Sequence, residues 1–189
     1  MKNRGLWIFL GVIAFLAVSS GIYYNRLVNL REGVTASWAQ VENVLQRRFD
    51  LIPNLVSTVK GYAKHEKQLL TDIVRLRSQW GNAKTQGEKV KTAGEIEGAL
   101  ARLLVVVEQY PNLKANEGFL RLQDELAGTE NRIAVERMRY NDAVRVYSVG
   151  IKGFPGVLFA KLFGFVPSGD YFQAEKEAAK APKVDFGAE

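Results

Sequence analysis

The sequence contains no cysteine and only one histidine, His65. The absence of cysteine excludes a disulfide framework, a thiolate metal site and a cysteine nucleophile. A single histidine excludes a metal site built from several histidines, and His65 stands in the polar run KHEK, where we expect an exposed turn residue. We therefore expect no catalytic residue, no metal site, no cofactor and no enzymatic activity.

Neither an apparent β-strand nor a glycine-rich phosphate loop is present in the sequence. The net charge of +6 is mild, and its lysines and arginines are interspersed along the chain. Nucleic-acid binding would need them gathered on one face or in one run, so no nucleic-acid partner is expected. With 47% hydrophobic and 24% charged residues, the 189-residue chain is long enough for one folded domain with a core.

Residues 6–24, LWIFLGVIAFLAVSSGIYY, carry no charge and follow a short flank at residues 1–5 that contains Lys2 and Arg4. A helix of this length spans roughly 28 Å, so the sequence predicts a single transmembrane helix. A cleaved secretory signal is the alternative, because small residues near Ser19 resemble a cleavage site. Slightly more positive charge precedes this stretch than follows it, which weakly favours a domain outside the cytoplasm.

Residues 25–62 continue the apolar pattern at helical spacing for about ten turns. A stripe of this length must be covered by other helices. Pro53 removes one backbone donor, and we expect a kink there rather than a restarted helix, because the stripe keeps its phase. The stripe comprises Leu27, Val34, Trp38, Val41, Leu45, Ile52, Leu55, Val59 and Tyr62.

Three more helices are predicted, at residues 66–80, 90–109 and 113–152, with a loop at residues 81–89. The last matches the first in length, at roughly 60 Å, whereas the middle two are about half as long. The predicted fold is all-α, with one N-terminal transmembrane helix followed by an up-and-down four-helix bundle over residues 25–152 that has two long and two short helices.

The short helices can cover only part of the long pair in this arrangement. The part near the membrane is then expected to keep an uncovered apolar seam that meets lipid, a second subunit or the C-terminal segment. The residues predicted to contact another subunit are Leu27, Leu30, Val34, Trp38 and Val41.

Residues 153–167, GFPGVLFAKLFGFVP, form an apolar membrane-proximal segment that is too short to cross a bilayer. The segment could plug the core of its own bundle, lie in the membrane interface or anchor in a groove of a neighbouring subunit. Residues 168–189 are expected to be mobile, or ordered only against a partner. The apolar side chains of the segment include Phe154, Leu158, Phe159, Leu162, Phe163 and Phe165.

Arg48 stands where the stripe calls for an apolar residue. If Tyr62 lies level with Lys114 in an antiparallel pair, Arg48 comes within reach of Glu130 and Glu125. We predict an ion pair with one of them that fixes the register of the two long helices. The alternative is that Arg48 extends along the helix surface to solvent.

Several blocks of the chain resemble the LemA family of bacterial membrane proteins. They are the stretches YNRLVNLREGV, RRFDLIPNLVSTVKGY, TENRIAVERMRYNDAV and FAKLFGF, together with the terminal KVDF. The resemblance covers nearly the whole chain. It implies a four-helix up-and-down bundle behind one span in the bacterial inner membrane, with no agreed enzymatic activity and no catalytic residues.

These observations together predict a membrane-anchored scaffold or interaction protein. Its expected partners are the lipid bilayer, further copies of itself in a homo-oligomer and other membrane proteins that it would help to organise. The alternative is a sensor or signalling input that acts through a membrane partner.

Overall fold

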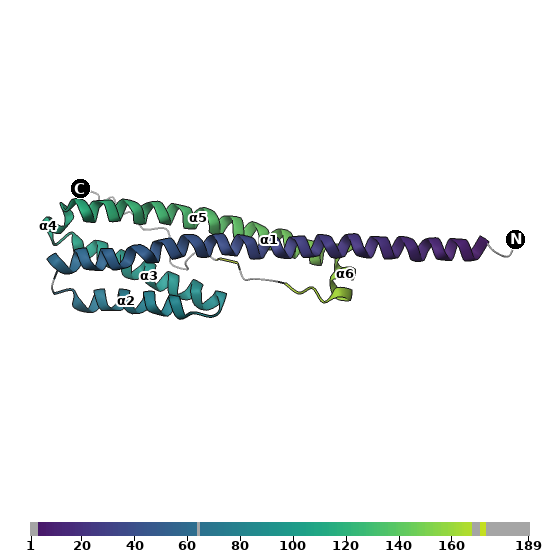
Figure 1. Cartoon of the computed structure of the whole chain (residues 1–189), viewed down its shortest axis with the longest axis horizontal. Coiled ribbons are helices and arrows are strands. Elements are labelled where there is room, and N and C mark those ends of the chain that lie inside the picture. The colour runs from purple at the N-terminus through teal and green to yellow at the C-terminus, as the bar shows by residue number, and fades with distance from the viewer. Residues whose placement is uncertain (1–3, 64, 168–170, 173–189) are drawn as a thin grey trace, which may run out of the picture. The chain divides into compact units, whose positions relative to one another are not determined.

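The computed structural model describes residues 4–63, 65–167 and 171–172, which form helices and no strand (Figure 1). The predicted all-α fold class is therefore confirmed for this part of the chain. The helices are α1 (Arg4–Tyr62), α2 (Lys67–Asn82), α3 (Gln86–Val107), α4 (Pro111–Lys114), α5 (Glu117–Lys152) and α6 (Gly156–Phe163).

The predicted apolar helix and the first long helix form one uninterrupted helix, α1. It continues through Pro53, so the chain does not restart there. A proline within a helix leaves the carbonyl four residues earlier without its usual donor. Here that carbonyl belongs to Phe49, and the Nε of Arg77 on α2 donates a hydrogen bond to it at 3.1 Å. A side chain from the neighbouring helix thus replaces the missing backbone bond.

The chain divides into two compact units. The central unit is Ala39–Glu136, and the terminal unit combines Met1–Trp38 with Arg137–Glu189. The helices α1 and α5 each pass from one unit into the other.

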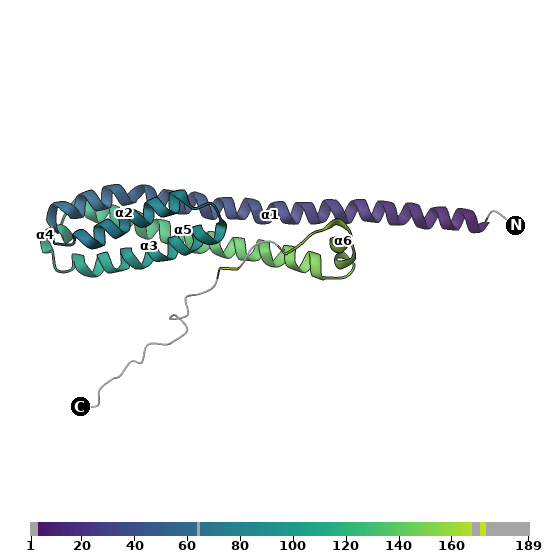
Figure 2. The same cartoon turned by 90° about the horizontal axis from the view of Figure 1, so that it is seen from below.

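The central unit is built from the second half of α1, from α2, α3 and α4, and from the first half of α5 (Figure 2). Phe49 of α1 packs edge-on against Trp80 of α2, with ring centroids 4.3 Å apart. At the turn end, the Asn116 side chain donates to the Tyr62 hydroxyl at 3.0 Å. The buried side chains of this core include Val41, Leu45, Ile52, Leu55, Val59, Ile73, Leu76, Ile96, Leu103, Leu113, Phe119 and Ile133.

Two helix ends differ from the predicted ones because side chains cap them. The side chain of Thr85 accepts from the Glu88 amide and the Glu88 carboxylate accepts from the Thr85 amide, so α3 begins at Gln86 rather than at residue 90. The side chain of Asn116 accepts from the Phe119 amide at 3.0 Å. The predicted helix at 113–152 is therefore divided into the short α4 and the long α5.

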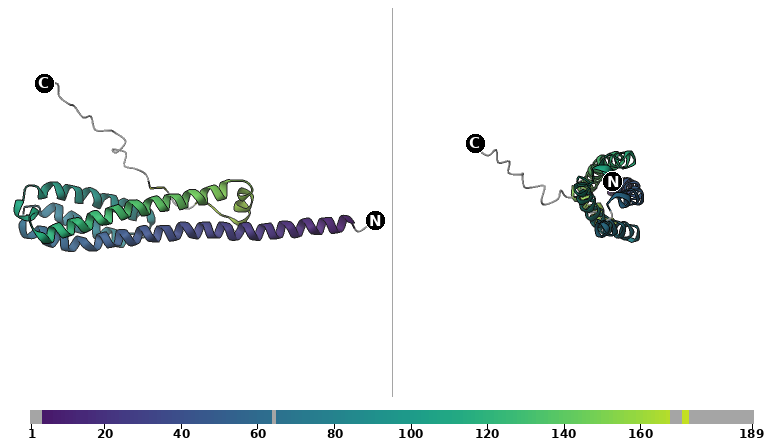
Figure 3. Two further views of the ribbon diagram at one scale, coloured as in Figure 1. Left: turned by 90° about the horizontal axis from the view of Figure 1, so that it is seen from above. Right: turned by 90° about the vertical axis from the view of Figure 1, so that its left-hand side faces the viewer.

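The terminal unit places the second half of α5 beside the first half of α1, with α6 against both (Figure 3). The unit has its own apolar core, formed by residues of α1 and α5. Its buried side chains include Leu27, Val34, Tyr140, Val144, Tyr147 and Ile151.

The prediction of an uncovered seam from Leu27 to Val41 is wrong. Leu27, Val34 and Val41 are only 1%, 4% and 0% exposed. The prediction held that the two long helices stay partly uncovered where the short helices do not reach, whereas α5 and Phe172 pack directly on this part of α1. At Gly150, for example, an added Cβ would lie 2.7 Å from Leu30 and 3.7 Å from Leu27.

Candidate functional site

Two tyrosines at the end of the apolar stretch of α1 hold α6. Tyr23 stacks on Phe159, with centroids 4.7 Å apart and planes 8° from parallel. Tyr24 meets Phe163 and Phe165 edge-on, at 5.1 and 5.8 Å. One face of α6 is thereby fixed against α1, which agrees in part with the expectation that this segment covers its own core.

Glycines allow α6 to fold back at this place. An added Cβ at Gly156 would overlap the Gly150 carbonyl oxygen, so the turn from α5 into α6 has no room for a side chain there. Gly164 ends the helix with φ of 73°, in the left-handed region that glycine tolerates best. The Phe165 amide then donates to the Ala160 carbonyl at 2.9 Å.

Tyr147 of α5 holds the chain that follows α6. Its hydroxyl donates to the Val166 carbonyl at 2.8 Å. Burial raises the pKa of the Tyr147 phenol, and the charge of Arg31 offsets part of this increase. The phenol therefore remains a protonated donor at neutral pH.

The predicted membrane-proximal apolar segment has a second face that nothing in the described chain covers. Phe154, Leu158 and Leu162 follow one another at intervals of four residues and are 86%, 58% and 69% exposed. Leu158 and Leu162 lie on one side of α6, because side chains four residues apart share a helix face, and Phe154 lies in the turn just before this helix. Phe159 and Phe165 are half-buried against the tyrosines, and Phe163 is at the margin between the two faces.

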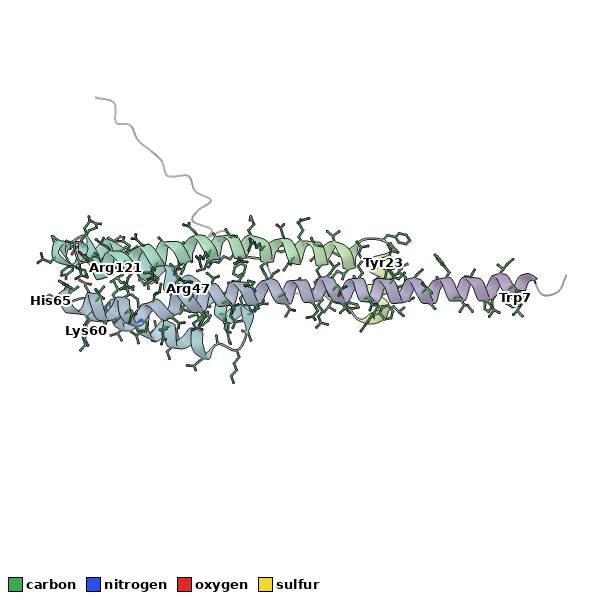
Figure 4. All side chains as sticks on the ribbon, turned by 45° about the horizontal axis from the view of Figure 1, so that its top comes forward. Trp7, Tyr23, Arg47, Lys60, His65 and Arg121 are labelled. Atoms are coloured by element: carbon green, nitrogen blue, oxygen red, sulfur yellow. The ribbon has the colours of Figure 1, made fainter. Side chains whose placement is uncertain are left out.

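The N-terminal part of α1 is also exposed and apolar. An 18-residue window of the helix has a mean hydropathy of 2.2, and none of it is buried. Trp7 and Tyr23 lie near the ends of this stretch (Figure 4). The stretch is long and apolar enough to cross a bilayer.

A hollow of about 310 Å³ lies where α1, α5 and the turn into α6 meet. It combines apolar walls with two cationic side chains, Arg26 and Arg145. Arg145 also donates to the Asp142 carboxylate on its own helix at 3.3 Å. The hollow has the chemistry to accept an anionic group attached to an apolar one. Its lining further includes Tyr23, Leu30, Val146, Val149, Phe154 and Pro155.

In the central unit, Arg48 contacts the Glu130 carboxylate through Nη1. The Arg48 side chain is 11% exposed and that of Glu130 is 39% exposed. Glu125, the other predicted partner, is exposed. Arg48 and Tyr62 on α1 are as far apart in sequence as Glu130 and Asn116, so both contacts fit one antiparallel register.

The remaining site predictions concern chemistry. His65 is exposed in the turn between α1 and α2 (Figure 4). Among the described residues, no group of three or more acidic or histidine side chains is placed to hold a metal ion. The predicted mobile tail lies outside the described residues except for Tyr171 and Phe172.

Phe172 is part of a cluster that the sequence did not predict. Its ring packs against Trp38 and Tyr140, and its backbone is bound by the Asn141 side chain. Trp38, predicted to contact another subunit, is thus half-buried against its own chain. Helical periodicity gave no signal for this contact, because Phe172 lies 31 residues beyond Asn141 and outside any helix.

The LemA family model matches residues 37–186, which include the whole central unit, all of α5 and α6, and the Phe172 segment. The chain belongs to the LemA family. Its LemA-family relatives include magnetosome protein MamQ 2 of Paramagnetospirillum magneticum, which is 30% identical over 93% of this chain and 73% of its own length.

Two further relatives are less similar to this LemA-family chain. Magnetosome protein MamQ of Magnetospirillum gryphiswaldense is 27% identical over 93% of this chain and 73% of its own length. Protein LemA of Metamycoplasma hominis is 24% identical over 68% of this chain and 63% of its own length. None of these names is that of an enzyme.

Proposed function

We propose that this protein is a membrane-anchored helical-bundle scaffold. It crosses the bacterial inner membrane once, associates with further copies of itself and organises the membrane or other membrane proteins. The second half of α1, α2, α3 and the first half of α5 act as an up-and-down four-helix bundle outside the bilayer.

The observation that carries the proposal is the paired apolar surface of the terminal unit. The exposed stretch of α1 is suited to the hydrocarbon, and Tyr23 and Tyr24 at its end hold α6, whose other face is exposed and apolar. A short helix with one apolar face at the edge of a span lies well in the membrane interface. In this placement, Arg26 and Arg145 lie at the level of the phosphate groups of the lipids.

Self-association needs a surface other than the predicted seam, because Leu27, Val34 and Val41 are already buried. The exposed side of α5 within the terminal unit offers Met138, Val146 and Val149, with 60%, 43% and 62% of their surfaces exposed. Apolar side chains at helical spacing on an anchored helix favour contact with a second copy. We propose this side of α5 as the subunit contact.

The membrane contact can be tested with single cysteines, because the chain has none of its own. An environment-sensitive dye on Leu158→Cys or Leu162→Cys should shift to the blue when the full chain is placed in lipid vesicles. The same dye on Val105→Cys should keep the emission spectrum that it has in water, because Val105 is an exposed residue of α3 in the central unit. Identical spectra at the α6 and α3 positions would exclude the interfacial contact.

Native mass spectrometry of the detergent-extracted chain tests self-association. The wild-type chain should give oligomers at about micromolar concentration, and the double variant Met138→Glu, Val149→Glu should give mainly monomers. A wild-type chain that is monomeric under these conditions would contradict the scaffold proposal.

A further inference from the structure

Phe172 occupies an aromatic slot on the surface of the terminal unit. Its ring stacks on Trp38, with centroids 6.0 Å apart and planes at 16°, and meets Tyr140 edge-on at 5.4 Å. Arg137 places its guanidinium carbon 5.3 Å from the centre of the same ring. Two aromatic contacts and one cation–π contact thus select a flat apolar side chain. We call Trp38, Arg137, Tyr140 and Asn141 the Phe172 slot.

The Asn141 side chain forms hydrogen bonds with both the amide and the carbonyl group of Phe172. Its Nδ2 donates to the Phe172 carbonyl at 3.0 Å, and its Oδ1 accepts from the Phe172 amide at 2.9 Å. Any residue except proline could make these two backbone bonds, whereas the ring contacts require an aromatic residue. The slot therefore has both parts of a peptide-binding site. Asn141 binds the main chain, and the aromatic rings of Trp38 and Tyr140 bind one side chain.

The connection to Phe172 is longer than the contact needs. Tyr147 fixes Val166, and Asn141 fixes Phe172. These anchors are six residues apart on α5, which is a rise of about 9 Å. The six residues from Val166 to Phe172 can extend to about 20 Å. The number of residues between the two anchors therefore does not by itself fix the position of Phe172, whereas its contacts with Trp38, Tyr140 and Asn141 do.

The same length of chain reaches beyond its own α5. Packed helices lie about 8–10 Å apart, so a copy beside the first brings its own slot within about 20 Å of Val166. Every copy carries one slot and one Phe172. In a membrane-anchored oligomer, the effective concentration of the neighbouring segment is high enough to compete with the internal one.

We infer that the Phe172 slot is a peptide-binding site that also accepts the Tyr171–Phe172 segment of a second copy. The ligand is an extended peptide with phenylalanine at its centre, and exchange of identical segments links neighbouring copies. This inference rests on the proposed self-association and specifies one of its contacts.

A photo-reactive benzoylphenylalanine in place of Tyr171 tests the exchange in the full chain in lipid vesicles. Tyr171 is exposed and precedes Phe172, so the probe leaves the bound ring in place. Isotope-labelled and unlabelled copies are mixed before illumination. We expect crosslinks that join residue 171 of one isotope to residues 137–145 of the other.

Asn141→Ala should reduce these intermolecular crosslinks about tenfold, because it removes two hydrogen bonds to the segment. The matched control is Asn131→Ala, an exposed asparagine on the same helix, which should leave them unchanged. Phe172→Ala should have the effect of Asn141→Ala, and because Phe172 lies outside α5 it tests the slot without altering that helix.

The outcomes separate the two proposals. Crosslinks confined to single copies, in a chain that native mass spectrometry shows to be oligomeric, would overturn the exchange and leave self-association standing. A monomeric chain would overturn both. Crosslinks between copies that survive both Asn141→Ala and Phe172→Ala would also overturn the exchange, since they would arise outside the slot.

Discussion

Arg48 is the one charged residue among the buried side chains of the described chain. It lies beside a cavity of about 230 Å³ whose walls include Leu55, Leu103 and Leu126, with Glu130 at its edge. A guanidinium in such surroundings needs a partner, because removing a charge from water is costly. The carboxylate of Glu130 meets that need while keeping part of its own hydration.

We predict that Arg48→Met and Glu130→Gln each lower the free energy of unfolding by about 2 kcal/mol, since each leaves the other group incompletely paired. The double variant should lose less than the sum of the two, with a coupling energy of about 1 kcal/mol. Urea denaturation followed by circular dichroism measures all four corners of this cycle. Glu125→Gln is the control, and strict additivity would show that Arg48 and Glu130 do not interact.

At the scale of single elements, the start of α3 depends on a reciprocal cap. Glu88 accepts from the backbone amides of Lys84 and Thr85, and these bonds lower the pKa of its carboxyl group. A carboxyl group with a lowered pKa in the folded state stabilises that state above its ordinary pKa. The stabilisation is lost as the pH falls through the lowered value.

We therefore predict that the first turn of α3 loses protection against hydrogen exchange between about pH 5 and about pH 3. Protection factors for residues 86–90, corrected for intrinsic exchange, measure the effect. Glu88→Gln retains an acceptor but does not titrate in this range, so its protection should not change with pH. A wild-type chain with equal protection at both ends of the range would contradict this account of the cap.

The sequence predicted where helices form more reliably than it predicted where they end or which residues pack against them. The stripe from Leu27 to Val59 identified the buried face of α1, since periodicity reports which side of a helix is apolar. The Thr85–Glu88 spacing is a readable capping signature, but the glycines around it indicated a longer loop. Matched helix lengths also predicted the antiparallel pairing of the two long helices, whereas the contact of Phe172 with Trp38 required the structure, because Phe172 lies outside any helix.

At the scale of the whole molecule, the two units differ in how the chain builds them. The central unit is one continuous stretch, Ala39–Glu136, whereas the terminal unit joins the two ends of the sequence. The central core draws on four helices within that stretch, including Phe49, Ile73, Ile96 and Ile133. The central unit thus contains the elements needed for an independent domain.

We predict that a fragment of residues 39–136 folds alone, with helical circular dichroism and a single cooperative thermal transition. Phe49→Ala in the fragment should lower its free energy of unfolding by about 3–5 kcal/mol, because it removes a fully buried ring beside Trp80. Val105→Ala, at an exposed position, is the control. A fragment that melts without cooperativity would show that its core needs the rest of α1 and α5.

The joining of the two chain ends in the terminal unit also has a consequence for synthesis. Residues up to Trp38 are synthesised first and belong to the terminal unit. The central unit is synthesised next, and the residues of the terminal unit from Arg137 onward follow it. The central unit can therefore fold during translation, whereas Tyr23 and Trp38 lack their partners until Phe159 and Phe172 have been made. The contacts that join the two ends of the terminal unit thus form only after the central unit has been synthesised.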